Sequence, residues 1–253
     1  MTWVIDLNAD LGESFGAYTM GDDAALLDVV TSASVACGFH AGDPMVMTRT
    51  VRTAAQRGVV VGAHVGYRDL HGFGRRAVAM SPAELTADVL YQLGALDGIA
   101  RANGTRVAYV KAHGALYNTA AVDATVAAAL VDAVCAFDAS LPVLTLPGSE
   151  VLKACSDAGV RAVAECFADR AYDRDGRLVP RSTPDAVIHD AGVVVRRAVE
   201  MATSGTVTAM DGSTVRLAAE SMCVHGDTPG SAALTSAVRN GLRDAGVELR
   251  PFV

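Results

Sequence analysis

The chain has 253 residues, of which 51% are hydrophobic and 19% are charged, so it can bury a large core and is not a disordered chain. Its formal net charge is −7, and Lys and Arg are scattered along the sequence, which argues against the basic stripe of a nucleic-acid-binding protein.

The first predicted element is a strand over residues 3–10 with two different faces. Alternation puts apolar side chains on one face, whereas the other face turns polar toward its C-terminal end through Asp6, Asn8 and Asp10. A β/α-barrel strand has this pattern when helices cover its outer side and the barrel interior opens into a site. A surface strand with a solvated acidic edge is the alternative.

Strands and helices then alternate along the chain. Further strands are predicted at residues 32–37, 59–64, 107–112, 143–146, 160–166 and 220–224. Helices are predicted at residues 22–30, 44–58, 81–103, 122–137, 149–158, 183–203 and 231–245. About seven βα units in one domain, residues 1–253, predict a seven-stranded parallel β/α barrel rather than an open sheet.

Two segments interrupt this alternation. The connection over residues 65–80 is longer than a βα loop needs to be, which indicates a functional lid; a rigid surface loop whose arginines pair with nearby acids is the alternative. Asp211-Gly212, between the segments 206–210 and 213–217, predicts a β-hairpin before the last strand.

Cysteine usage and the N-terminus bear on location. The five cysteines form no CxxC pair, which argues against a disulfide framework or a zinc knuckle. Asp6 and Asp10 stand where a signal peptide needs an uninterrupted apolar run, and no segment reaches membrane-spanning length. We therefore expect a cytoplasmic protein with no membrane partner.

Histidines gather at the predicted strand ends. His40, His64, His113 and His225 each follow a predicted strand, and a barrel brings all strand ends to one face. Lys111 lies two residues before His113, so both side chains can face the barrel interior. Such an amine is either a pKa-tuned acid or base or a fixed cation for an anionic substrate.

Arginines offer possible anion-binding groups. Arg75, Arg170 and Arg181 carry guanidinium groups that can bind a carboxylate through two hydrogen bonds, although each could equally be a solvated surface residue. The sequence contains no P-loop, GxGxxG or GxSxG motif.

Seven motifs, in order along the chain, resemble the LamB/YcsF family. They are DLNADLGE at 6–13, ACGFHAGDP at 36–44, GAHVGY at 62–67, FGRR at 73–76, KAHGALYN at 111–118, ECFADR at 165–170 and VHGD at 224–227. The resemblance implies a barrel of the glycoside hydrolase/deacetylase type. It also implies ATP-dependent opening of the 5-oxo-L-proline (pyroglutamate) lactam to L-glutamate, in a 5-oxoprolinase complex with two further subunits, B and C.

The resemblance also implies cofactors and residue roles. ATP with Mg is expected to be handled with the partner subunits, and no tightly bound metal is expected. Opening a lactam needs a base for water, an acid for the leaving nitrogen and donors for the oxyanion. Asp10 or His113 is the expected base, with Lys111 and His64 as electrostatic stabilisers. The expected substrate-binding residues are Asp6, Asn8, His40, Arg75, Asn118, Glu165, Arg170 and His225.

Two other functions stay open at this point. In a metal-dependent amidohydrolase or sugar deacetylase, Asp10 and two histidines would hold a divalent ion that activates water, but the HxxxH pair typical of those deacetylases is absent. A non-catalytic subunit that presents pyroglutamate to its partners is also compatible with the polar strand ends.

Overall fold

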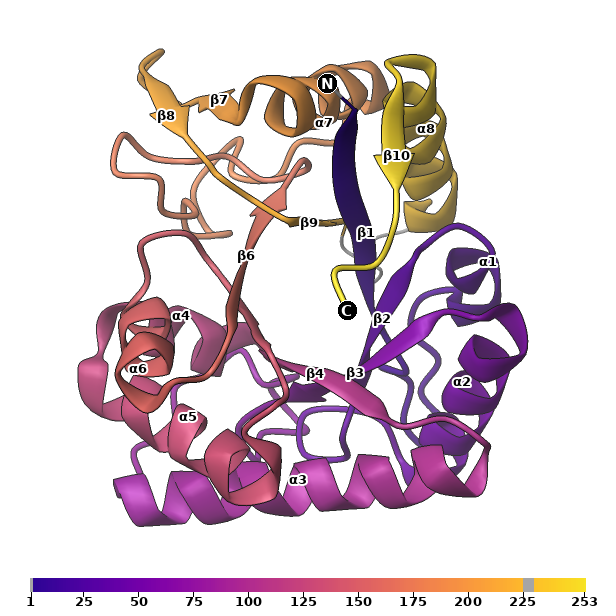
Figure 1. Cartoon of the computed structure of the whole chain (residues 1–253), viewed down its shortest axis with the longest axis vertical. Helices are drawn as coiled ribbons and strands as arrows, with labels where there is room; N and C mark the ends of the chain where they lie inside the picture. The colour runs from indigo at the N-terminus through magenta and orange to yellow at the C-terminus, as the bar shows by residue number, and fades with distance from the viewer. Residues whose placement is uncertain (1, 225–229) are drawn as a thin grey trace.

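Parallel strands close into a barrel inside a ring of helices in the computed structural model, which describes residues 2–224 and 230–253 (Figure 1). The barrel strands are β1 (Trp3–Leu11), β2 (Ser32–Ala36), β3 (Val60–Val65), β4 (Val107–Ala112), β5 (Val143–Thr145), β6 (Ala162–Phe167) and β9 (Ser221–Cys223). Each strand pairs with the next one in this order, and β9 pairs back onto β1. The predicted seven-stranded parallel barrel is confirmed.

Helices cover the outside of the barrel. They are α1 (Asp23–Leu27), α2 (Pro44–Arg57), α3 (Pro82–Ala102), α4 (Gly114–Val122), α5 (Ala124–Asp138), α6 (Glu150–Ala158), α7 (Ala191–Ser204) and α8 (Ser231–Asp244). In Figure 1, α3 runs along one side of the molecule, and α7 and α8 lie on the opposite side. Two predicted helix starts are confirmed, since Asp43 caps α2 and Ser81 forms a capping box with Glu84 on α3.

One helix was not predicted, and another begins later than predicted. The helix predicted over residues 122–137 is confirmed as α5, but a separate helix, α4, precedes it, and the two meet at Asp123, whose side chain caps α5. The helix predicted from residue 183 begins only at Ala191, because Asp190 provides its N-cap. The residues before it cannot be helical throughout, since Asp185 has a left-handed φ of 62°.

The predicted hairpin is confirmed, and one further strand was not predicted. Around Asp211-Gly212, β7 (Thr206–Thr208) pairs antiparallel with β8 (Thr214–Arg216) outside the barrel. Near the C-terminus, β10 (Val247–Leu249) pairs with the first residues of β1. In Figure 1, β10 lies directly beside β1.

The barrel interior is filled in layers. At the N-terminal end of the strands the ring of Tyr109 is fully buried and lies 5.1 Å from the ring of Phe252, centroid to centroid. Gly62 is required opposite this ring, because a Cβ there would come within 2.2 Å of it. The predicted apolar face of β1, which includes Ile5 and Leu7, instead packs outward in the core that contains residues of α7 and α8. A pocket therefore opens toward the C-terminal ends of the strands.

Among the described residues, no single helix is long and apolar enough to cross a membrane. Only α4 and α5 taken together, a pair bent by 115°, reach that length and composition.

Candidate active site

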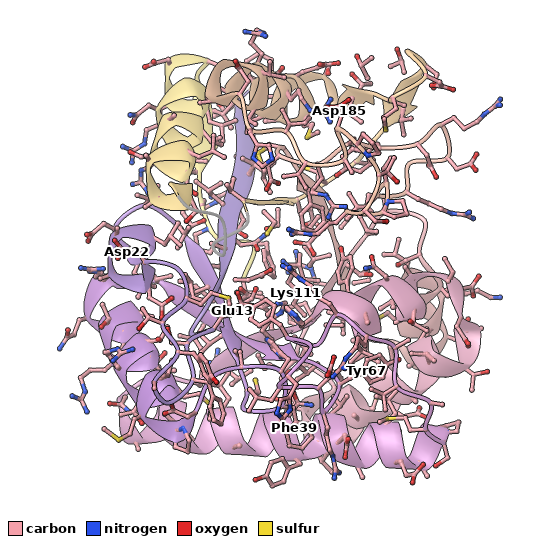
Figure 2. All side chains as sticks on the ribbon, turned by 180° about the vertical axis from the view of Figure 1, so that it is seen from behind. Glu13, Asp22, Phe39, Tyr67, Lys111 and Asp185 are labelled. Atoms are coloured by element: carbon pink, nitrogen blue, oxygen red, sulfur yellow. The ribbon has the colours of Figure 1, made fainter. Side chains whose placement is uncertain are left out.

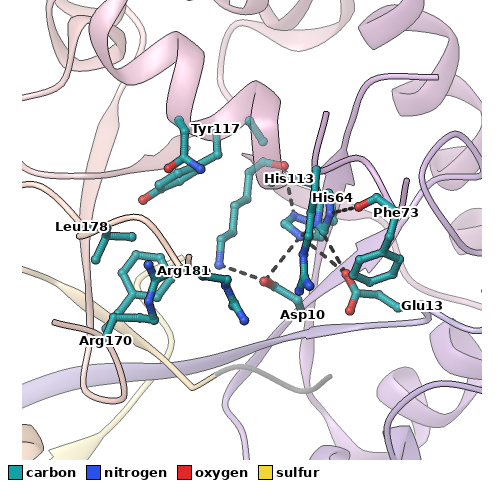
Figure 3. Close-up of a pocket in the computed structure, with 15 residues that line it drawn as sticks. Asp10, Glu13, His64, Phe73, His113, Tyr117, Arg170, Leu178 and Arg181 are labelled. Atoms are coloured by element: carbon teal, nitrogen blue, oxygen red, sulfur yellow. Dashed lines mark hydrogen bonds and ion pairs between the residues drawn. The ribbon is translucent and has the colours of Figure 1, made fainter. Parts of the chain in front are cut away.

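A pocket of about 550 Å³, including its open mouth, lies over the C-terminal ends of the barrel strands (Figure 3). Its lining residues are Asp10, Glu13, His64, Phe73, Arg75, Lys111, Ala112, His113, Gly114, Tyr117, Asn118, Phe167, Arg170, Leu178 and Arg181. In Figure 2, Glu13 and Lys111 lie inside the ring of helices, whereas Asp22 and Asp185 lie near its rim.

A buried lysine forms the floor of the pocket. Lys111 is 2% exposed, and its Nζ lies 2.9 Å from Asp10 Oδ1 and 3.1 Å from Glu165 Oε2. Burial opposes the charged form, but the two carboxylates outweigh it and hold the pKa of Lys111 well above its usual value. The same amine lies 3.3 Å from Cys223 Sγ, and burial raises the pKa of that thiol, so Cys223 stays protonated. Lys111 is therefore a fixed cation.

Asp10 connects this lysine to a cluster of histidines. Its Oδ2 lies 3.4 Å from His64 Nε2, and 12% of its side chain is exposed. In Figure 3, Asp10 lies between the group of His64, His113 and Glu13 on one side and Tyr117 with Arg170 on the other. Asp10 is thus the carboxylate at the centre of the pocket.

Three histidines from three βα units pack together beside Asp10. The rings of His40 and His113 stack with centroids 3.7 Å apart, and His64 meets both edge-on. Burial and the neighbouring His64 lower the pKa of His113 to about 3, and burial with the neighbouring histidines also lowers the pKa of His40. Glu13 faces all three rings, with Oε1 between 3.4 and 4.0 Å from one nitrogen of each.

Asp6 and Asn8 form a polar layer beneath the pocket. Asn8 donates to Ser221 Oγ over 2.7 Å, and its Oδ1 lies 3.4 Å from Lys111 Nζ, so this amide orients the lysine. Asp6 is fully buried and accepts hydrogen bonds from Thr31, Ser32 and Ser221. Burial raises the pKa of Asp6 to about 6, although these hydrogen bonds oppose the shift.

Arginines gather at the other side of the pocket. Arg75 and Arg181 are exposed and line it, and the guanidinium group of Arg75 lies 5.1 Å from the centre of the Phe73 ring. Arg170 also lines the pocket but is only 6% exposed, because it donates to the carbonyl oxygens of Ala186 and Val179. Arg170 therefore organises the segment before α7 as well as adding charge to the pocket.

The loop over residues 66–81 is tied to its surroundings. The backbone of Gly66 both donates to and accepts from the buried side chain of Gln92 on α3. Arg68 pairs with Asp88 on α3, and Arg76 pairs with Asp69 inside the loop. These contacts favour the rigid loop over the lid.

Gly74 fixes the loop against the histidines. A Cβ on Gly74 would come within 2.7 Å of both His113 and His40, and its φ is +62°. The Gly74 carbonyl also accepts from the amide of Ala115 at the start of α4. Glycine is thus needed here for close packing.

The structure brings together seven of the residues predicted for the site. Those that line the pocket are Asp10, His64, Lys111, His113, Arg75, Asn118 and Arg170. Four others, Asp6, Asn8, His40 and Glu165, lie buried beneath or beside the pocket and do not line it. His225 lies outside the described residues.

Sequence reasoning missed several lining residues, chiefly Glu13 and Tyr117. A signal for Glu13 was present, since it closes the first motif three residues after Asp10. Tyr117 belongs to α4, whose existence was not predicted, so nothing in the strand pattern placed it at the pocket. Both residues lie just beyond strand ends, where alternation no longer predicts which way a side chain points.

Comparisons with known proteins agree with the fold and the motifs. A family model described as the LamB/YcsF family matches residues 5–253. The protein named as the A subunit of 5-oxoprolinase in Kocuria rhizophila is 60% identical over 98% of this chain and 99% of its own. The protein of the same name in Paracidovorax citrulli is 58% identical over the same shares.

Solved structures give the same result. The lactam utilization protein of Thermus thermophilus superimposes with a TM-score of 0.94 and 47% identity, covering 98% of this chain and all of its own. A family 4 carbohydrate esterase from Streptomyces lividans, at 12% identity and a TM-score of 0.51, covers 99% of this chain and 93% of its own and shares the fold alone. The chain belongs to the LamB/YcsF family.

Proposed function

We propose that this chain is the A subunit of an ATP-dependent 5-oxoprolinase, which hydrolyses the 5-oxo-L-proline lactam to L-glutamate together with B and C subunits. The names of the close relatives support this assignment. The observation that carries it is the buried pair of Lys111 and Asp10 in a small pocket, with arginines on the opposite side. Such a pocket suits a small carboxylate whose amide carbonyl becomes negatively charged during reaction.

Asp10 is the general base in this proposal. Its carboxylate is reachable from the pocket, whereas His113 has a low pKa and its Nε2 donates to the Phe73 carbonyl oxygen over 2.8 Å. Water attacks the lactam carbonyl carbon while Asp10 takes one of its protons. The ring C–N bond then breaks, its electron pair stays on nitrogen, and the proton passes from Asp10 to the new amine.

Lys111 stabilises the negative charge that the carbonyl oxygen and the phosphoryl group attached to it carry. It is held charged and oriented by Asp10, Glu165 and Asn8 before substrate arrives, so little reorganisation is needed during the reaction. The exposed guanidinium groups of Arg75 and Arg181 hold the substrate carboxylate, for which Arg offers two parallel hydrogen bonds.

ATP and Mg act together with the partner subunits. A five-membered lactam is a stable amide, and transfer of the γ-phosphoryl group of ATP to its carbonyl oxygen, which releases ADP, makes attack by water feasible. Ring opening then leaves an acyl phosphate, and a second water cleaves it to L-glutamate and inorganic phosphate. The chain carries no phosphate-binding loop motif, which supports nucleotide handling that is shared with B and C.

Reconstitution tests this function. The purified chain alone should form no L-glutamate from 5-oxo-L-proline, and addition of B and C subunits with Mg-ATP should start its formation. ATP-independent turnover by the isolated chain would refute the proposal, as would a complete complex that binds 5-oxo-L-proline without forming glutamate.

A matched pair of variants then tests the site. Asp10→Asn should abolish glutamate formation in the complex, whereas His71→Ala, at an exposed position of the loop after β3, should leave it unchanged. If Asp10→Asn turns over at the normal rate, Asp10 is not the base. If the variant instead forms no glutamate because it no longer binds 5-oxo-L-proline, Asp10 holds the substrate and is not shown to be the base.

A further inference from the structure

We propose that Glu13, His40, His64 and His113 bind one divalent transition-metal ion of the zinc class beside the pocket. These residues come from the C-terminal ends of four successive βα units, and each offers one ligand atom; the four atoms all lie within 4.8 Å of one another. All four residues are buried. This site is additional to the lactam chemistry of Asp10 and Lys111, and its existence does not depend on that function.

The distances suit a metal ion at the centre of the four atoms. Glu13 Oε1 lies 3.6 Å from His40 Nε2, 4.0 Å from His64 Nε2 and 3.4 Å from His113 Nδ1. Zinc bonds of about 2.0–2.2 Å in a tetrahedron place neighbouring ligand atoms roughly 3.4 Å apart. These three separations lie within about 0.6 Å of that value. The rings of His40 and His113 stack in parallel, so one of them has to rotate for both to point a nitrogen at one ion.

His64 and His113 each have one ring nitrogen that faces away from the cluster, here called the outer nitrogen. The contacts of these outer nitrogens determine which nitrogen of each ring carries the proton and which keeps its lone pair. His64 Nδ1 lies 3.3 Å from the Lys111 carbonyl oxygen, and His113 Nε2 lies 2.8 Å from the Phe73 carbonyl oxygen. A carbonyl oxygen only accepts, so both outer nitrogens carry the proton in the neutral rings. Metal-binding histidines are commonly held by this kind of outer contact to a backbone carbonyl.

The inner nitrogens consequently face each other as two acceptors. His64 Nε2 and His113 Nδ1 are 2.9 Å apart, and no tautomer of two neutral rings satisfies both the carbonyls and this contact. A cation beside the two nitrogens removes the conflict, because both lone pairs then become ligands.

The burial of His40 is an independent observation that indicates a bound ion in this cluster. It is fully buried, and neither of its ring nitrogens has a hydrogen-bond partner among the described residues. Burying a polar ring without partners is costly, yet Gly74 and Gly66 both pack closely enough against His40 to hold it in this position. Its Nε2 lies 3.6 Å from Glu13 Oε1, and one of its ring nitrogens belongs to the set of four ligand atoms.

The ligand set indicates which metal fits. Three imidazoles and one carboxylate suit Zn²⁺, Co²⁺ or Ni²⁺, whereas Mg²⁺ and Ca²⁺ need oxygen ligands throughout. The sequence analysis left open a metal site with Asp10 and two histidines as ligands, whereas Glu13 was not among the expected ligands. The histidines of this cluster come from different βα units and form no HxxxH pair.

Metal content and stability test the proposal on the full chain. The protein is stripped with a chelator, exposed to ZnCl₂, desalted and measured by elemental analysis; one zinc ion per chain and a raised melting temperature are expected. With CoCl₂, the visible spectrum should show the d–d bands of a four-coordinate nitrogen and oxygen site, without the strong near-ultraviolet band of thiolate ligands. A wild-type chain that retains neither metal would overturn the site.

Variants locate the ion. His40→Gln and Glu13→Gln should each lose the bound zinc and its stabilisation, whereas His71→Ala and His189→Ala, which remove exposed histidines, should keep both. Zinc retained by both site variants overturns the assignment of the ligands. If one site variant does not fold, the other variant and the wild-type cobalt spectrum still decide.

Discussion

Lys111→Met should strongly destabilise the protein, because it removes the shared partner of two carboxylates. Glu165 is fully buried and Asp10 largely so, and both lie within 3.1 Å of the lysine amine. Removing one partner of a buried ion pair typically costs about 3–5 kcal/mol. For a chain of this size that loss lowers the melting temperature by roughly 6–20 °C.

The chain offers a matched control in its other lysine. Lys153 is 71% exposed and lies 4.0 Å from Glu150 on the same helix, so Lys153→Met should change the free energy of unfolding by less than about 1 kcal/mol. Unfolding in urea, followed by circular dichroism, measures both variants. Equal stability losses in the two variants would refute the reasoning.

A double variant shows whether the lost stability is electrostatic. Lys111→Met with Glu165→Gln replaces the more deeply buried carboxylate by a neutral amide that keeps its shape. The double variant should regain about 0.5–3 kcal/mol relative to Lys111→Met alone, as expected for interacting neighbours. If the two losses simply add, the stability lost in Lys111→Met reflects packing and not unpaired charge.

Three further predictions concern the pocket and its floor. In the reconstituted complex, Asp10→Asn should lower the rate of glutamate formation about 100-fold or more while leaving the fold intact by circular dichroism, and a smaller loss would point to another base. Arg75→Ala should lower kcat/KM about ten-fold or more, whereas Arg76→Ala, whose arginine pairs with Asp69 away from the pocket, should not; equal effects would show that the loop acts only through its structure. The pKa of Asp6 is raised from 3.8 to about 6, so the folded chain holds this proton more tightly than the unfolded chain, and up to about 3 kcal/mol of stability present below pH 3.8 is lost as the pH rises through 6. Asp6→Asn should remove that decline from a series of urea unfolding curves, and an unchanged decline would show that another group causes it.

The barrel was predictable because its signals are local. Each strand is a short apolar run, and Asp43 and the Ser81 capping box mark helix starts within a few residues. The failures lie where local signals are weak. α4 begins without a side-chain cap, since the amide of Ala115 is satisfied by Gly74 from a distant loop, and β10 is a three-residue strand defined only by its partner.

The sequence predicted which strand ends carry the site residues, but not which of these residues contact one another. Alternation places Asp10 and Lys111 inside the barrel, and barrel geometry then brings the two strand ends to one face. The stacking of His40 on His113 depends on how two loops pack, and the selection of Glu13 depends on a turn after β1. Neither of these contacts produces a periodic pattern in the sequence.

The double pairing of β1 delays completion of the barrel until β9 and β10 have been synthesised. Asp6 bonds to Ser221 across 215 positions of chain, and the residues before Asp6 pair with β10. Closing a loop of this length costs on the order of 5 kcal/mol of chain entropy before any pairing offsets it. While the chain emerges from the ribosome, β1 can pair with β2 early, but its other edge and the carboxylate of Asp6 must wait for the last strands. Until then the nascent chain exposes the open edge of β1. This strand carries acidic residues that the folded barrel buries, and their charges oppose pairing with a wrong strand.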